Sequence, residues 1–263
     1  MIPAFDLSKW YADCITENGD ALIIYHAQLR WHTPAIHYSN LLIHESGKPV
    51  SSRFSLRKQS APVYTEEEVT WKSPVWKAEG SWKDTGAQVC EILFESTEGR
   101  LEWNCVAPRS IADVRIGKDR FFRGHGYAEH LRLTIPPWRL PIRQLRWGRF
   151  INACDALTWI DWQGSSNKQV VYYNGLPETA RMIGDREIVF GDDGARLSLD
   201  AGTILREGAL GATVLAVLPN VDRLFPAGIL GIRECKWLSH ALLRRPGHVD
   251  SAGMAIHEVV EWP

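Results

Sequence analysis

The sequence lacks closely spaced cysteines and a recognisable leader, and both absences limit the classes of protein to which it can belong. Its five cysteines are scattered, and no two form a Cys-x-x-Cys pair, which argues against a zinc site built from neighbouring ligands. An odd, dispersed set is typical of reduced, buried thiols in a cytosolic protein. Residues 1–14 have neither the basic start nor the apolar core of a secretory signal. We therefore expect a cytoplasmic location.

The sequence also has little net charge and no long apolar run. Thirty basic side chains nearly balance 31 acidic ones, so no charge excess predicts a nucleic-acid partner. The longest apolar stretch, Gly208–Pro219, is too short to span a bilayer, and we expect it to form a buried strand pair with a bend. The motifs GxGxxG, HExxH and GxSxG are absent from suitable contexts. We accordingly predict no cofactor and no bound metal.

Short strand-like segments dominate what is present, together with twelve tryptophans. The segments are rich in β-branched and aromatic residues and end at Gly, Pro or Asp turns. They cover residues 21–31, 36–47, 88–94, 101–106, 112–116, 187–190 and 195–199, and the last two flank a Gly-Asp-Asp-Gly turn. Helical periodicity is weak and confined to 237–245 and 7–16. This pattern predicts an all-β protein made of sandwiches or barrels.

Three sequence matches indicate an internal duplication. Asp20-Ala21-Leu22 recurs as Asp155-Ala156-Leu157, Tyr38 and Asn40 recur as Tyr172 and Asn174, and Gly126–His130 recurs loosely as Gly253–His257. The matches keep their order, and each offset is close to half the chain. We therefore predict two antiparallel β domains, at residues 1–135 and 150–263. The proline-containing segment 136–149 is expected to be a connector.

A polar pair interrupts an apolar strand face in the first half. Because alternate residues of a strand share a face, Tyr127 and Glu129 lie on the side that carries Leu131 and Leu133. The aligned residues of the second half begin with the apolar Met254 and Ile256. Buried polar groups cost free energy unless they are hydrogen-bonded, so a pair present in only one half indicates function.

We expect Glu129 to point into the cavity of the first domain beside Tyr127. Burial there would raise the pKa of the carboxyl group, because desolvation penalises its charged form. Three alternatives stay open: the face is exposed to solvent, Glu129 pairs with an arginine such as Arg132, or a β-bulge at Gly126 or Ala128 turns the pair outward.

Gly126–Glu129 resembles the Gly-Tyr-x-Glu/Asp signature of the family that holds acyclic carotenoid hydratases (hydroxyneurosporene synthases), tocopherol cyclases and lipocalin-like Diels–Alderases. Trp103–Pro108, Trp147-Gly148 and Asp161-Trp162 resemble further segments of that family. The resemblance implies two lipocalin-like domains and a hydrophobic ligand. It also implies that Tyr127 and Glu129 protonate or hydrate an alkene. Glu102 lies near the place of the family's upstream histidine, a departure that favours a more general acid-catalysed reaction over carotenoid hydration.

Further residues are candidates to line the ligand site. His26 and Asp161 occupy matching repeat positions, six residues after Asp20 and Asp155. Aromatic rings stabilise positive charge through their π faces, and an ordinary core role is the alternative for each tryptophan. The complete predicted ligand-binding set is Trp103, Glu102, His26, Trp159 and Asp161, with Trp162 as an additional wall.

The predicted connector combines arginine with tryptophan. Its charged residues are Arg139, Arg143, Arg146 and Arg149, and they alternate with Trp138 and Trp147. Such a segment could grip an anionic ligand group or make peripheral contact with a membrane. The alternative is a connector that packs through its apolar groups and keeps its arginine heads solvated.

These observations lead to one functional hypothesis and two rivals. The hypothesis is an enzyme, a hydratase-like lyase, cyclase or isomerase, that acts without redox chemistry on an apolar polyene- or isoprenoid-like molecule. Glu129 is its general acid and Tyr127 the partner of that acid. The rivals are a carrier that binds an apolar ligand without chemistry and a protein-interaction module, because fold alone cannot separate catalysis from binding.

Overall fold

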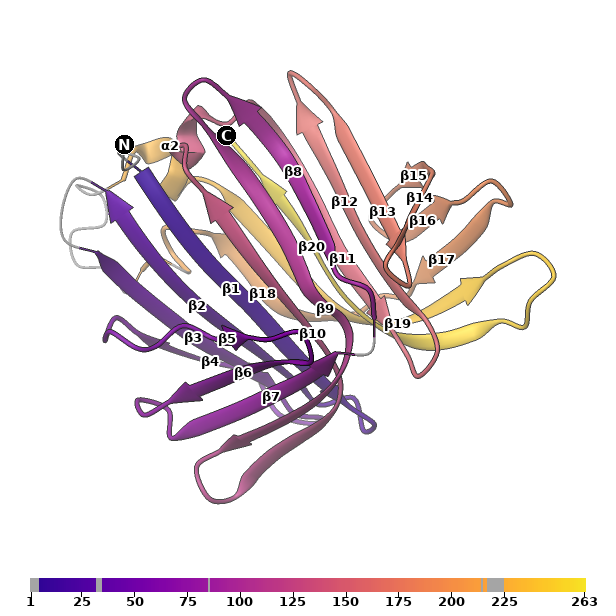
Figure 1. The fold of residues 1–263 in the computed structure, drawn as a ribbon, viewed down its shortest axis with the longest axis horizontal. Helices are drawn as coiled ribbons and strands as arrows, with labels where there is room; N and C mark the ends of the chain where they lie inside the picture. Colours follow the sequence, from indigo (N-terminus) through magenta and orange to yellow (C-terminus); the bar gives the residue numbers. More distant parts are fainter. Residues whose placement is uncertain (1–4, 32–34, 85, 214, 217–224) are drawn as a thin grey trace. The chain divides into compact units, whose positions relative to one another are not determined.

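The chain divides into two compact units, Met1–Pro136 and Pro137–Pro263. The computed structural model describes residues 5–31, 35–84, 86–213, 215–216 and 225–263. Each unit is built on one ten-stranded antiparallel sheet (Figure 1). The all-β, antiparallel class predicted from the short strand signals is confirmed.

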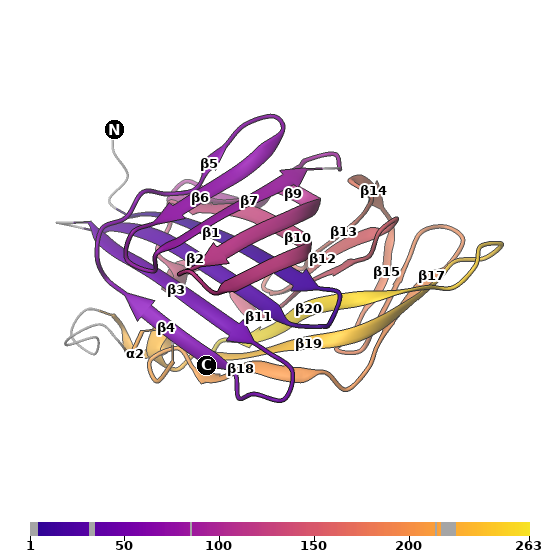
Figure 2. The same cartoon turned by 90° about the horizontal axis from the view of Figure 1, so that it is seen from below.

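The first unit consists of ten strands. They are β1 (Phe5–Thr16), β2 (Ala21–Trp31), β3 (Ile36–His44), β4 (Ser51–Ser55), β5 (Val63–Tyr64), β6 (Glu68–Ser73), β7 (Ala78–Asp84), β8 (Val89–Ser96), β9 (Gly99–Ile116) and β10 (Arg120–Leu133). Figure 2 shows β1, β10 and β9 following one another across the sheet. The predicted strands at 101–106 and 112–116 are both parts of β9, a single long strand.

The second unit repeats this arrangement. Its elements are η1 (Pro137–Arg139), β11 (Ile142–Ile151), β12 (Ala156–Gly164), β13 (Lys168–Tyr173), β14 (Leu176–Glu178), β15 (Ala180–Ile183), β16 (Glu187–Phe190), β17 (Ala195–Leu199), β18 (Thr203–Ala209), α2 (Ala227–Leu230), β19 (Arg233–Arg244) and β20 (Ser251–Glu261). The hairpin predicted around Gly-Asp-Asp-Gly is present as β16–β17.

The two sheets have the same strand order, which establishes the duplication. The first runs β4-β3-β2-β1-β10-β9-β7-β6-β5 with β8 paired to β9, and the second runs β14-β13-β12-β11-β20-β19-β17-β16-β15 with β18 paired to β19. Each strand of the second unit therefore matches the strand ten numbers earlier. First and last strands of each unit pair at the centre of its sheet.

Several local predictions were wrong, and strand pairing explains two of the cases. Residues 7–16 and 237–245 lie in strands β1 and β19, because sheet contacts on both sides override a weak helical period. Most of the predicted connector is β11, the counterpart of β1, so residues 142–149 belong to the second sheet. Within Gly208–Pro219, β18 ends at Ala209 and residues 210–213 form a turn, while 214 and 217–219 lie outside the described residues.

Two side-chain predictions also need correction. Arg149 is fully buried, and Arg146 makes ion pairs with Asp161 and Asp185, so the arginine heads of this segment are not simply solvated. The cysteines are free, as expected for reduced thiols, but Cys90 and Cys154 are exposed.

The ladder registers correct the sequence alignment of the repeats. When the repeats are aligned on Ala21 of β2 and Ala156 of β12, Tyr25 corresponds to Ile160. The ladder partner of Tyr25 is Tyr11, and that of Ile160 is Trp147, so Tyr11 corresponds to Trp147. Tyr11 also pairs with Glu129, and Trp147 also pairs with Glu258. Glu129 therefore corresponds to Glu258 and not to Ile256.

The ladder registers also show that Asn40 and Asn174 do not occupy corresponding positions in the two repeats. Leu22 pairs with Ile43, whereas its counterpart Leu157 pairs with Tyr173. Asn40 thus lies inside β3, while Asn174 follows the end of β13.

Each unit has its own apolar core on one face of its sheet. In the first unit Ala12 and Ala128 contribute to this core, together with Leu22, Ile24 and Trp82. Phe150, Trp159 and Leu197 are members of the core of the second unit. Because strand residues alternate, the neighbours of Ala12 and Ala128 project from the opposite face of the first sheet.

Gly148 tests the packing of the second core. A Cβ atom at this position would lie 2.2 Å from Cζ2 of Trp159 and 2.8 Å from Cβ of His257. We expect Gly148→Ala to lower the free energy of unfolding by about 1–3 kcal/mol through overpacking, measured by urea denaturation. Gly228→Ala is the matched control, since nothing lies within 4 Å of its added Cβ. Equal stability of both variants would contradict the packing described here.

Candidate functional site

Two Tyr-Ala-acid tripeptides face each other across β1 and β10. Tyr11 pairs with Glu129, Ala12 with Ala128, and Asp13 with Tyr127. The tripeptides run in opposite directions, so each tyrosine stands opposite the acid of the other strand. Both alanines point into the apolar core, and the tyrosines and acids lie together on the opposite face.

Each tyrosine is hydrogen-bonded to the acid of its own strand. The Tyr127 hydroxyl donates to Oε2 of Glu129 at 2.6 Å, and the Tyr11 hydroxyl donates to Oδ2 of Asp13 at 2.8 Å. The two phenol rings meet edge to face, with centroids 5.9 Å apart. The strand register therefore brings two tyrosine–carboxyl pairs side by side.

Trp103, on the adjacent strand β9, completes the group. Its indole Nε1 donates to the same Oε2 of Glu129 at 2.5 Å. Tyr127 and Asp13 are fully buried, while Glu129 retains 8% exposure. We call Tyr11, Asp13, Trp103, Tyr127 and Glu129 the tyrosine–acid cluster.

Burial and neighbouring groups set the protonation state of Tyr127. Desolvation is the largest cause that raises its pKa well above 10, followed by the nearby Cys105 and Glu129. The phenol is therefore neutral at physiological pH and serves as a hydrogen-bond donor, not as a base.

The orientation predicted for Glu129 was wrong in one respect. The side chain does lie beside Tyr127, but on the face opposite to the apolar core of the first unit, because Ala128 between them occupies the core side. The register between β10 and β9 shifts on both sides of Ala128, as expected of a β-bulge. The pair is nevertheless buried and hydrogen-bonded.

The apolar core of the first unit and the tyrosine–acid cluster lie on opposite faces of the same two strands, β1 and β10. Trp82 of the core donates its Nε1–H to the backbone oxygen of Asp13 at 2.6 Å. A Cβ atom on Gly126 would lie 2.7 Å from Cδ1 of Trp82, so glycine lets this indole approach the strand. The Gly of the Gly-Tyr-Ala-Glu segment thus has a packing role directly behind the tyrosine and the acid.

The equivalent face of the second unit carries charges instead of tyrosines. Lys236 is 1% exposed, forms an ion pair with Glu258, and lies 3.9 Å from Glu234. Its Nζ also lies 5.2 Å from the ring centroid of Trp147. By register, Trp147 and Glu258 correspond to Tyr11 and Glu129. Only the first unit therefore has the tyrosine–acid arrangement at these positions.

The other predicted ligand residues lie elsewhere. Glu102 neighbours Trp103 but projects from the other face of β9, and it pairs with Arg100 at 2.5 Å. Trp159 belongs to the core of the second unit, and Asp161 accepts hydrogen bonds from Arg146, Gln163 and Gln169. Trp162 is also buried in the second unit.

His26 lies on the core side of β2, opposite Trp10 in the ladder. It is 4% exposed, and its Nδ1 has no hydrogen-bond partner among the residues that the structure describes. Burial is the main cause that lowers its pKa to about 4, with a smaller contribution from His37. His26 and Asp161 occupy corresponding ladder positions, as the repeat predicted.

Sequence reasoning found Tyr127, Glu129 and Trp103 but missed Tyr11 and Asp13. The missed pair lies in the segment interpreted as a weak helix. A usable signal was nevertheless present, since Tyr-Ala-Asp at 11–13 matches Tyr-Ala-Glu at 127–129.

Within the described ranges, no three His, Cys, Asp or Glu side chains gather in a way that could hold a metal. The same part of the chain contains no helix with the length and apolarity needed to cross a membrane.

Fold and repeat together define a two-unit, lipocalin-like β protein. No protein-family model and no curated protein matches the sequence significantly, but solved structures do. Kievitone hydratase from Nectria haematococca aligns with a TM-score of 0.59 and 10% identity, covering 97% of this chain and 88% of the other. CghA, solved with Sch210972, aligns at 0.58 and 11% with the same coverage.

A putative AttH from Nitrosomonas europaea is also similar, with a TM-score of 0.50, 9% identity, and coverage of 97% and 92%. These structures confirm the lipocalin-like fold that the Gly-Tyr-Ala-Glu resemblance implied. At such low identity they define the fold alone.

Two buried histidines predict how stability depends on pH. The pKa of His26 and that of His257 are each lowered from 6.5 to about 4, chiefly by burial. Between these values the unfolded chain binds more protons, so the free energy of unfolding should fall as pH drops from 6.5 to 4. The loss should reach up to ~3 kcal/mol per histidine.

Urea denaturation between pH 7 and pH 4 measures this dependence. His26→Gln should flatten it, whereas the exposed His248→Gln should keep the parent slope. An unchanged slope in His26→Gln would show that His26 does not resist protonation in the folded state.

Proposed function

We propose that this protein is an enzyme that catalyses a non-redox, acid-assisted reaction on a largely apolar small molecule. The reaction is a hydration, cyclisation or isomerisation of a polyene- or isoprenoid-like substrate. The observation that carries the proposal is the tyrosine–acid cluster, in which two carboxyl groups and two phenols lie buried on one sheet face. Functional sites are where burial and neighbouring groups perturb titratable residues.

Glu129 is the proposed proton donor. Both Tyr127 and Trp103 donate to its Oε2, so in the neutral acid Oε2 serves as the carbonyl oxygen and Oε1 carries the proton. Transfer of that proton to a substrate double bond creates a carbocation. The ring faces of Trp103 and Tyr127 can stabilise the positive charge.

Tyr127 acts as a positioning group for the acid. Because its pKa is raised well above 10, it keeps its proton and continues to donate to Oε2 after Glu129 has released its own. It thereby stabilises the carboxylate that the transfer leaves behind.

Asp13 is the proposed base. In a hydration, water adds to the carbocation and loses one proton to Asp13, so the substrate gains one H and one OH. In an isomerisation, Asp13 removes a proton from carbon instead, and the composition of the substrate is unchanged. Tyr11 holds Asp13 through its 2.8 Å hydrogen bond.

The fold comparisons support this class of reaction. Kievitone hydratase is a hydratase by name, and CghA was solved with the small molecule Sch210972. The twelve tryptophans also suit contact with an apolar ligand. The rival function is a carrier, which would bind the same ligands and return them unchanged.

The decisive variant is Glu129→Gln, which keeps the shape of the side chain but removes the acid. Purified protein is incubated with a panel of polyenes and prenylated phenols in D₂O, and products are analysed by mass spectrometry. We expect the parent to place one deuterium on carbon, and Glu129→Gln to lower turnover by about 10²–10⁴-fold. Binding, followed by tryptophan fluorescence, should change little.

Glu102→Gln is the matched control, because this glutamate is next to Trp103 but on the opposite strand face. It should react at the parent rate. Binding without turnover in the parent would establish the carrier, and a Glu129→Gln variant as active as the parent would remove Glu129 as the acid.

Asp13→Asn should separate the two halves of the reaction. With Glu129 intact, the substrate can still be protonated, so we expect deuterium to enter recovered substrate while water addition falls at least tenfold. Tyr11→Phe should have a smaller effect in the same direction. If Asp13→Asn and Glu129→Gln have identical effects on both measurements, Asp13 has no separate role as a base.

A further inference from the structure

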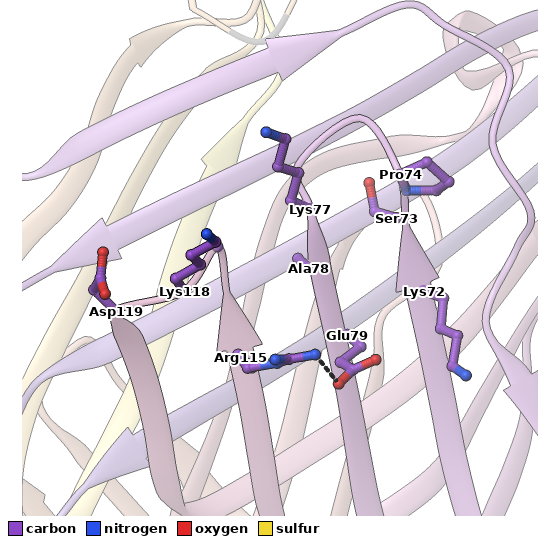
Figure 3. A pocket seen from close by; sticks show the side chains of 10 residues that line it. Lys72, Ser73, Pro74, Lys77, Ala78, Glu79, Arg115, Lys118 and Asp119 are labelled. Atoms are coloured by element: carbon purple, nitrogen blue, oxygen red, sulfur yellow. Dashed lines mark hydrogen bonds and ion pairs between the residues drawn. The ribbon is translucent and has the colours of Figure 1, made fainter.

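A pocket of about 530 Å³ opens at one end of the first unit. It lies between the turn that joins β6 to β7 and the turn that joins β9 to β10, as Figure 3 shows. The two turns are tied together, because the backbone N–H of Gly117 donates to the carbonyl oxygen of Lys77 at 2.8 Å. None of the residues of the tyrosine–acid cluster lines this pocket.

Positive charge predominates around the pocket. Four cationic side chains, Lys72, Lys77, Arg115 and Lys118, face only two acidic ones, Glu79 and Asp119. Arg115 is engaged with Glu79 through a 2.7 Å ion pair, which Figure 3 marks. Across the described residues, the structure gives none of the three lysines an ion-pair partner, so their charges are available to an anion that enters the pocket.

Lys77 occupies an unfavourable backbone conformation. Its φ is +50°, in the left-handed region that glycine and asparagine adopt more readily. The facing turn has Gly117 at φ +66°. A lysine at the strained position of the first turn costs stability, and strain of this kind is concentrated at functional sites.

We propose that this pocket binds a small organic anion through a phosphate or carboxylate group. The lysines would attract the anion and neutralise its charge. The volume falls in the range of small-molecule sites, and Pro74 and Ala78 add apolar wall. This site is independent of the reaction assigned to the tyrosine–acid cluster.

Titration calorimetry tests the site with two probes, pyrophosphate for the phosphate class and citrate for the carboxylate class, against chloride at equal ionic strength. The parent should bind at least one probe more tightly than chloride, and more weakly as salt increases. Lys77→Gln and Lys118→Gln should each weaken binding by about two- to fivefold. Lys83→Gln, an exposed lysine on β7 outside the pocket, should bind like the parent.

Lys77→Gly separates binding from structure. Removing the strained side chain should raise the melting temperature of the free protein and at the same time weaken anion binding. A purely structural lysine would not show these opposite changes. The proposal is overturned if neither probe binds better than chloride, if Lys83→Gln loses as much affinity as Lys77→Gln, or if Lys77→Gly binds like the parent.

Discussion

The pairing of β1 with β10 is the constraint on which the rest of the first unit depends. It joins the first strand of the unit to its last strand at the centre of the sheet, and it fixes a register in which Ala12 faces Ala128. A slip of β1 by one residue would move Tyr11 and Asp13 to the core side and away from Tyr127 and Glu129. The apolar core therefore enforces the register, and the register in turn assembles the tyrosine–acid cluster.

Duplication supplied two copies of this framework, and they have diverged in chemistry while keeping their topology. At corresponding ladder positions the first unit has Tyr11 and Glu129, whereas the second has Trp147 and Glu258 with Lys236 beside them. One unit holds phenols that donate to acids, and the other holds a buried ion pair. The arrangement indicates that the fold is maintained by the core face and that the opposite face is free to change.

The sequence predicted the class of fold and the proximity of Tyr127 and Glu129, but not the sheet face on which they lie. Turn residues and β-rich segments were enough to indicate antiparallel sheets in duplicate. Tyr127 and Glu129 were singled out because a polar pair stood out against Leu131 and Leu133, and Trp103 because Trp103–Pro108 resembles a segment of the family. Which face lies inward could not be read, since both faces of β10 carry buried residues. Tyr11 and Asp13 were missed because their segment was interpreted as a weak helix and because their ladder partners, Glu129 and Tyr127, lie 118 and 114 residues away in the sequence.

The hydrogen bond from Trp82 to the backbone of Asp13 has an evolutionary consequence. Only the backbone of one strand separates the apolar core from the acids. A substitution on the core face of that strand therefore shifts the side chains on its opposite face. The geometry of the tyrosine–acid cluster can thus be altered by residues on the core side of the sheet. Variants selected for a changed cluster should therefore accumulate substitutions among the small residues on the core side of β1 and β10 as well as on the face that carries the cluster.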